Sequence, residues 1–249
     1  MEPNILPQQP QTIYGPETGR SVRAFLSQVF SYMATALIIS GVMAWWFGHN
    51  EELILNLYTI DLAAGKASLN ILGWVVMLAP LGLVFAMGGL LNRVSSTILL
   101  IMFLAFSVIN GISLSFIFLT YAEASIFRVF FMAAGLFAIM AVAGYTTKTD
   151  LTKLGSLLFI GLIGIIIGSL LNAFFFESST MDYVISIIGV IIFTGLTAYD
   201  MQKLKRMGEQ IATGTETAQK MALMGALSLY LDFINLFLML LRLFGGKRD

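Results

Sequence analysis

Cysteine is absent from the 249 residues of this chain, and histidine occurs once, as His49. The lack of cysteine excludes disulfides, zinc–thiolate sites and cysteine nucleophiles, and one histidine cannot build a zinc site. The sequence also contains no glycine-rich phosphate loop, no metal-ligand cluster and no nucleophile–base pair. We therefore expect neither enzymatic activity nor a resident cofactor.

Charge is equally scarce. Asp, Glu, Lys and Arg make up 11% of the chain, against about 25% in a soluble domain. The net charge is zero, which argues against a nucleic-acid partner. With 58% hydrophobic residues and a mean hydropathy of +0.87, the chain has too little polar surface to cover a soluble globule. The composition predicts an all-α integral membrane protein whose surroundings are the lipid bilayer.

Seven apolar runs are each close to the ~20 residues needed to cross the hydrocarbon of a bilayer. They are residues 24–47, 70–91, 96–120, 127–147, 154–176, 183–201 and 221–244. Residues 1–20 hold four of the five prolines and are predicted to form a flexible tail, which leaves 21–249 as a single transmembrane domain. Most connections are short, except 48–69 and the polar, basic stretch 202–220.

The distribution of basic residues predicts that the N-terminus lies on the cytoplasmic side of the membrane. With a cytoplasmic N-terminus, nine of the 14 Lys and Arg residues lie in inside segments and five lie outside. The inside set includes the cluster at 203–206, which we interpret as an orientation signal or a contact with anionic lipid. Seven spans then place the C-terminus outside. Lys247 and Arg248 fit poorly there, unless the last segment re-enters the membrane instead of crossing it.

Two aspartates stand out because they are the only carboxylates inside the apolar segments, Asp200 and Asp232. A charged side chain deep in a bilayer is unfavourable by roughly 2.5–3.5 kcal/mol on insertion scales. Asp232 lies near the middle of its apolar run, so it must be protonated, paired or exposed to water. Each aspartate is therefore a candidate functional residue.

The last apolar run carries a polar stripe. At 100° per residue, Ser228, Asp232 and Asn235 fall within about 60° of one line, together with Gly225 and Met239. The opposite side of this helix is Leu, Phe and Ile. Such a stripe is predicted to face the interior of the helix bundle or a water-filled cavity.

Asp200 ends the sixth apolar run, beside Tyr199, and lies toward the cytoplasmic side. Asp232 comes about eleven residues into the seventh run, so the two could differ in depth by roughly 10 Å. They meet only if the sixth helix continues past Asp200, or if the seventh begins outside the hydrocarbon. The string MQKLKRM after Asp200 contains only good helix formers, which allows the first option.

If the two carboxylates meet, they cannot both ionise cheaply and are expected to share a proton as a coupled pair. Deprotonation would add repulsion between the last two helices and create an oxygen-rich site suited to transient binding of Ca²⁺. The alternative is that each aspartate is satisfied separately by hydroxyls, amides or a cation such as Arg93. The residues alone leave both interpretations open.

Three strings carry a resemblance to a known family. They are GYTTKTDL from Gly144, GLTAYDMQKLK from Gly195 and ALSLYLDFINLFLMLLRLFG from Ala226. Together they resemble the Bax inhibitor family, also called TMBIM, and above all its bacterial branch. The resemblance implies a bundle in which six helices surround a central seventh. It also implies a location in a bacterial inner membrane.

The resemblance further implies roles for particular residues. The family is associated with a pH-sensitive leak of Ca²⁺, and its paired aspartates on helices six and seven correspond here to Asp200 and Asp232. An arginine near the end of the second helix is linked to this latch in bacterial relatives, and Arg93 is the candidate. The polar side chains expected to support the pair are Tyr199, Ser228 and Asn235.

Three functions compete at this stage. The first is a Ca²⁺ leak channel gated by the proton-sharing aspartates. The second is a regulatory protein, because family members are also described as suppressors of cell death and as binders or modulators of a membrane-bound protease. The third is an intramembrane aspartyl protease. It is disfavoured because Leu229, Tyr230 and Leu231 precede Asp232, where such enzymes carry glycine.

Overall fold

The computed structural model describes residues 16–61, 66–212 and 214–248. Within this part of the chain, seven helices are long and apolar enough to cross a membrane, as predicted. They are α1 (Pro16–Gly48), α3 (Ile71–Leu90), α4 (Ser96–Leu114), α6 (Glu123–Thr146), α7 (Thr152–Leu171), α8 (Ser179–Gln210) and α9 (Glu216–Phe244). The protein is an integral, multi-pass membrane protein. Most of the predicted tail, residues 1–15, lies outside the described residues, and α1 begins within its last five positions.

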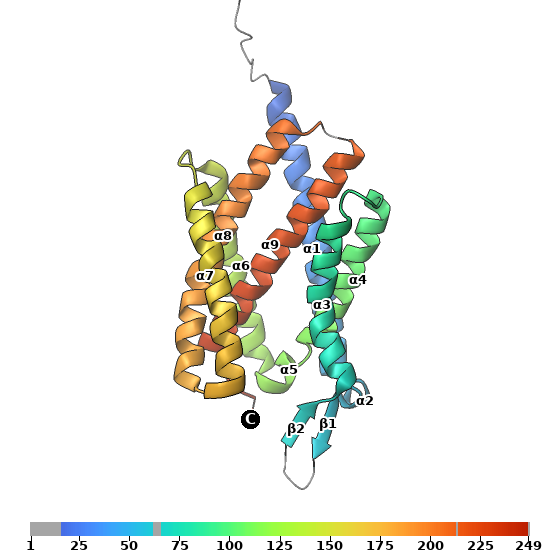
Figure 1. The fold of residues 1–249 in the computed structure, drawn as a ribbon, viewed down its shortest axis with the longest axis vertical. Coiled ribbons are helices and arrows are strands. Elements are labelled where there is room, and N and C mark those ends of the chain that lie inside the picture. Colours follow the sequence, from blue (N-terminus) through green and yellow to red (C-terminus); the bar gives the residue numbers. More distant parts are fainter. Residues whose placement is uncertain (1–15, 62–65, 213, 249) are drawn as a thin grey trace, which may run out of the picture.

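Short elements fill the connections at one end of the bundle (Figure 1). The long connection predicted over 48–69 contains a helical turn and an antiparallel hairpin in which Tyr58 pairs with Leu69. These elements are α2 (Glu51–Leu55), β1 (Tyr58–Asp61) and β2 (Lys66–Leu69), followed later by α5 (Ile117–Thr120) and the π-helical turn η1 (Asn172–Phe176).

Helix α9 is the central helix, which confirms the expected architecture. It runs obliquely through the bundle (Figure 1) and packs against α8, α1, α6, α4 and α3. It is the most buried of the seven long helices, whereas α7 is the least buried and packs mainly against α8. Because α9 is enclosed by protein, polar side chains on it avoid the energetic penalty of contact with lipid.

A buried hydrogen-bond network anchors one side of α9. The fully buried Tyr230 hydroxyl lies 2.6 Å from the Ser40 hydroxyl of α1 and accepts a hydrogen bond of 2.8 Å from Asn110 Nδ2 of α4. Ser40 in turn donates to the carbonyl of Ser107 at 2.6 Å. These bonds satisfy the buried polar groups and fix the rotation of α9 relative to α1 and α4.

The connection predicted over residues 202–220 is shorter in the structure, so this prediction was wrong in its length. Helix α8 continues to Gln210, and α9 begins at Glu216, so the connection is only residues 211–215. Thr215 caps α9 by accepting a hydrogen bond from the backbone N–H of Ala218. The charged residues of this stretch are good helix formers, so their polarity marks exposed helix and not a loop. This extension of α8 is the condition under which the two aspartates were expected to meet.

The last helix does not end at mid-depth. Its 29 residues correspond to about 43 Å of helix, which is enough to cross a bilayer. At the far end, residues 246–248 lie against residues 118–125 in what we call the C-terminal clasp. The Gly246 carbonyl accepts from Ala122 N–H, and Arg248 Nη1 donates to the Phe118 carbonyl at 2.9 Å. The clasp thus gives Arg248 a hydrogen-bond partner at the end of the bundle where a basic residue was expected to fit poorly.

Candidate functional site

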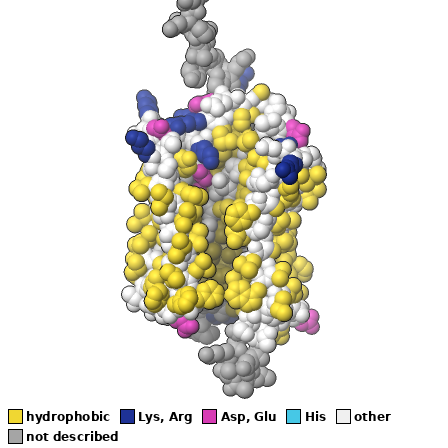
Figure 2. Space-filling model, in the orientation of Figure 1, with side chains coloured by type: hydrophobic (Ala, Val, Ile, Leu, Met, Phe, Trp, Pro, Cys, Tyr) yellow, Lys and Arg dark blue, Asp and Glu magenta, His cyan; other side chains and the backbone are white. Residues whose placement is uncertain are grey.

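A cavity of about 1020 Å³ lies between α3, α4, α7, α8 and α9. It corresponds to the hollow on the face of the molecule seen in Figure 2, whose walls are largely hydrophobic. Its polar lining residues are Asn110, Ser156, Ser169, Tyr199, Asp200, Lys203, Ser228, Asp232 and Asn235. A mostly apolar pocket with a few convergent polar groups is the usual form of a binding site.

The predicted polar stripe of α9 faces this cavity. Ser228, Asp232 and Asn235 all line it. Asp232 is only 6% exposed, and its Oδ2 has no hydrogen-bond partner among the described residues. Leaving a buried polar atom unpaired is unfavourable by about 1–3 kcal/mol. The unpaired oxygen therefore indicates that Asp232 has a role other than stabilising the fold.

Asp200 reaches the same cavity from α8. Its carboxyl group lies beside the Ser228 hydroxyl and near the Lys203 ammonium, which is about one turn further along the helix. The two aspartates line the same cavity from the neighbouring helices α8 and α9. The structure thus brings both predicted carboxylates to one site, and sharing of a proton between them stays a prediction.

Tyr199 is held at the cavity by a close approach of α7 to α8. A Cβ atom added to Gly155 would lie 2.5 Å from Cδ2 of the Tyr199 ring, which only glycine tolerates. The ring lines the cavity next to Asp200. Any larger residue at position 155 would displace either the ring or α7.

The structure does not place Arg93 at this site. Arg93 is exposed in the turn after α3, where its backbone N–H donates to the Leu90 carbonyl, and it is not among the lining residues of the cavity. The basic residue at the cavity is Lys203. Sequence reasoning missed it because the basic cluster 203–206 was interpreted as an orientation signal or a lipid contact. Its spacing of three residues from Asp200 was the available signal.

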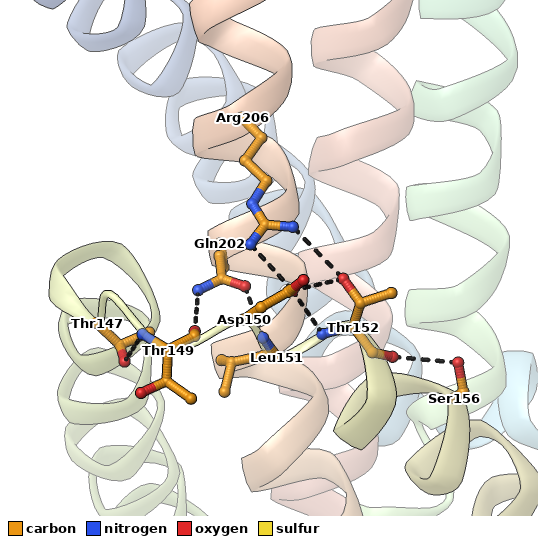
Figure 3. A network of polar contacts seen from close by, with 8 residues as sticks. All are labelled: Thr147, Thr149, Asp150, Leu151, Thr152, Ser156, Gln202 and Arg206. Atoms are coloured by element: carbon orange, nitrogen blue, oxygen red, sulfur yellow. Dashed lines mark hydrogen bonds and ion pairs between the residues drawn. The ribbon is translucent and has the colours of Figure 1, made fainter.

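Two of the segments that carry the family resemblance contact each other. Gln202 on α8 accepts a hydrogen bond from Leu151 N–H at 2.9 Å and donates one to the Thr149 carbonyl at 2.8 Å (Figure 3). Arg206, one turn later, pairs with Asp150 at 3.0 Å. Both contacts hold the α6–α7 loop against the part of α8 that lies beyond Asp200.

Asp150 is the centre of this loop. Its Oδ1 accepts from the hydroxyl and the backbone N–H of Thr152, at 2.6 and 3.0 Å. These bonds and the Arg206 guanidinium lower the pKa of Asp150 to about 2. Lys205 adds a further contact by donating to the Tyr145 carbonyl at 3.0 Å. The basic cluster therefore helps to keep α8 helical past Asp200.

The oxygen atoms that line the cavity are ligand types suited to a hard cation. Carboxylate oxygens of Asp200 and Asp232, amide oxygens of Asn110 and Asn235 and the Ser228 hydroxyl are the ligand types that Ca²⁺ accepts. The described residues contain no group of three or more His, Cys, Asp or Glu side chains placed to share a metal ion. The donor set fits weak, transient binding.

The chain is similar in sequence to known proteins over most of its length. The family model described as "Inhibitor of apoptosis-promoting Bax1" matches residues 22–249. The inner membrane protein YbhL of Escherichia coli strain K12 is 40% identical over 238 residues, which cover 95% of this chain and 97% of that protein. An uncharacterized protein of Borreliella burgdorferi is 45% identical over 225 residues, which cover 90% and 93% of the two chains.

Proposed function

The chain belongs to the Bax inhibitor family, and from this premise we propose that it is a pH-sensitive calcium leak channel of the bacterial inner membrane. The similarity to an E. coli protein named for that membrane supports the location. The observation that carries the proposal is the pair Asp200 and Asp232, which line one cavity beside the central helix. The buried, unpartnered oxygen of Asp232 supports it further.

The cavity has the features needed to bind Ca²⁺ briefly. Two carboxylates, with nearby amide and hydroxyl oxygens, can replace part of the ion's hydration shell. Permeation requires binding that is strong enough to admit the ion and weak enough to release it. A site with only two carboxylates, one of them near the Lys203 ammonium, meets both conditions.

Protons gate this site through the charge of the aspartates. The ionised pair carries two negative charges and binds a divalent ion more strongly than a pair that shares one proton, which carries one charge and releases the ion sooner. We therefore expect the leak to increase as the pH falls from about 8 to 6. This mechanism uses Lys203 as the neighbouring basic residue and assigns no gating role to Arg93.

The test is Ca²⁺ flux into dye-loaded proteoliposomes across this pH range, for the wild type and Asp232→Asn. We expect a pH-dependent flux in the wild type and a pH-independent flux in the variant, since an amide does not titrate. Asp182→Asn is the matched control, because Asp182 is on α8 but outside the cavity. No flux above empty liposomes at any pH would contradict the proposal and favour a regulatory role through partner binding.

A further inference from the structure

The cavity opens sideways, toward the lipid. Helix α3 packs mainly on α4 and helix α7 mainly on α8, and the hollow between these two pairs is visible on the flank of the molecule in Figure 2. Both α3 and α7 contribute side chains to its lining. A membrane protein meets hydrocarbon on this flank, so molecules dissolved in the bilayer can reach the cavity without passing through water.

The walls of this opening are built for a hydrocarbon chain. Met77 and Leu81 on α3 and Ile160, Ile166 and Leu170 on α7 line the cavity and are 43–67% exposed. On α7 the lining runs from Gly155 to Leu170, a distance of about 22 Å along the helix. One leaflet of hydrocarbon is about 15 Å thick. A single alkyl chain therefore fits along the opening.

The polar end of the cavity has the opposite character. Asp200 and Asp232 lie there, and Lys203 is the one basic residue among the described residues that line the cavity, so these groups in ionised form carry one uncompensated negative charge. The α3, α4 and α7 walls contribute no titratable side chain to the lining, and Tyr199 of α8 is the remaining titratable group. A buried carboxylate with an unpaired oxygen is complemented by a cation that has N–H donors.

We propose that this cavity binds a single-chain amphiphile with a protonated amine head group, which enters from the bilayer between α3 and α7. The ammonium group pairs with the Asp232 carboxylate, and the chain lies against Leu81 and Ile166. An anionic head group is repelled by the two carboxylates, and a neutral alcohol loses the charge-assisted bond. The bound amphiphile occupies the same carboxylates that the proposed Ca²⁺ leak uses. Its binding is independent of the proposed function, and only its effect on Ca²⁺ flux rests on that function.

Binding is tested by photocrosslinking with a long-chain primary amine that carries a diazirine in its alkyl chain. The full-length protein is reconstituted in phosphatidylcholine nanodiscs, and adducts are mapped by mass spectrometry. We expect adducts on the cavity walls of α3 and α7. An unmodified amine of the same length should displace the probe, whereas the alcohol and the alkyl sulfate of that length should not.

Two variants and a control make the result specific. Asp232→Asn keeps the shape of the side chain, and it should raise the amine concentration needed for half-displacement by at least about tenfold. Ile166→Trp fills the opening and should remove most labelling of α3. Ile139→Trp, on the lipid-facing side of α6 and 66% exposed, should leave the pattern unchanged. Equal labelling of α6 and α7 that neither cavity variant alters would show ordinary lipid contact and overturn the proposal.

The consequence for transport is measured separately. We expect the amine to inhibit wild-type Ca²⁺ flux over the concentration range in which it displaces the probe. Specific labelling in a protein that shows no flux would leave the binding site standing and remove the leak. A pH-dependent flux without specific labelling would support the leak and overturn the amphiphile-binding site.

Discussion

The middle of helix α9 and the segment that follows its C-terminus differ in how their polar groups are satisfied. In the middle of the helix, Asp232 is buried beside the cavity, and its Oδ2 has no hydrogen-bond partner among the described residues. Beyond the end of the helix, the polar groups of the C-terminal clasp are paired. Gly246 N–H donates to the Ser125 hydroxyl at 2.7 Å, and Arg248 N–H donates to the Thr120 carbonyl at 3.0 Å.

His49 extends the clasp to α1. Its Nδ1 lies 2.8 Å from the Trp45 carbonyl, and its Nε2 contacts the Glu123 carboxylate. Both partners only accept hydrogen bonds, so both ring nitrogens donate only when the ring is protonated. The Trp45 carbonyl and Glu123 accordingly raise the pKa of His49 above 6.5. The difference between the two regions indicates that the paired groups stabilise the bundle, while the unpaired carboxyl of Asp232 is the candidate for a functional role.

Replacing Asp232 with leucine should have the largest effect among the variants that test the difference between these two regions. At a pH at which both aspartates are ionised, the apolar side chain removes a buried carboxylate together with its repulsion from Asp200, so the free energy of unfolding should rise by about 1–3 kcal/mol. Thermal unfolding in detergent measures this as a higher Tm. Asp182→Leu is the matched control and should not raise the Tm, because Asp182 accepts a hydrogen bond from Asn172 at 2.8 Å. A lower Tm for Asp232→Leu would show that Asp232 is a structural residue.

Tyr230→Phe tests the anchored side of the same helix. The substitution leaves Asn110 without its acceptor and removes the 2.6 Å contact with Ser40. We expect the free energy of unfolding to fall by about 1–2 kcal/mol, with the pH dependence of flux retained. Tyr183→Phe is the control, since Tyr183 is 57% exposed. An unchanged Tm in Tyr230→Phe would mean that this network does not stabilise the bundle.

Arg248→Ala tests the clasp itself. The change removes the 2.9 Å hydrogen bond from the guanidinium to the Phe118 carbonyl and should lower the free energy of unfolding by about 1 kcal/mol. Hydrogen exchange should increase in residues 118–125 and remain unchanged around the cavity. Faster exchange both in residues 118–125 and around the cavity would contradict the separation between the two regions.

His49→Gln should give the smallest effect, because the His49–Glu123 pair is partly exposed, with side chains 34% and 51% accessible. A raised pKa means that the pair's contribution is complete below about pH 6.5 and is lost as the pH rises through the raised value. The wild type should therefore exceed the variant by less than about 1 kcal/mol in acid and by nothing in alkali. A Tm difference that is constant with pH would contradict this assignment.

The sequence was enough to predict the seven spans and the central helix, because hydrophobic run length and the resemblance both depend on local residues. It also predicted the polar stripe, since Ser228, Asp232 and Asn235 share one face by helical spacing alone. The extent of α8 was missed because a charged run is compatible with a loop or with exposed helix. The tertiary bonds from Gln202 and Arg206 to the α6–α7 loop support the helix.

The partners of the aspartates were harder to predict. Arg93 was a candidate both as a possible cation partner and through the family resemblance. The extent and orientation of the helices, which the sequence does not give, decide which basic side chain reaches the cavity. Lys203 does so because α8 stays helical past Asp200. The lateral opening was also beyond sequence reasoning, because it depends on α3 and α7 packing on different neighbours.

The central claim is that Asp200 and Asp232 act as one titrating unit, and the most direct test is a double-mutant cycle on the pH profile of Ca²⁺ flux. The flux of the wild type, Asp200→Asn, Asp232→Asn and the double variant is compared across about pH 6–8. The account predicts that either single substitution abolishes the pH dependence and that the double variant behaves like the singles. Independent, additive shifts in the two single variants would contradict it.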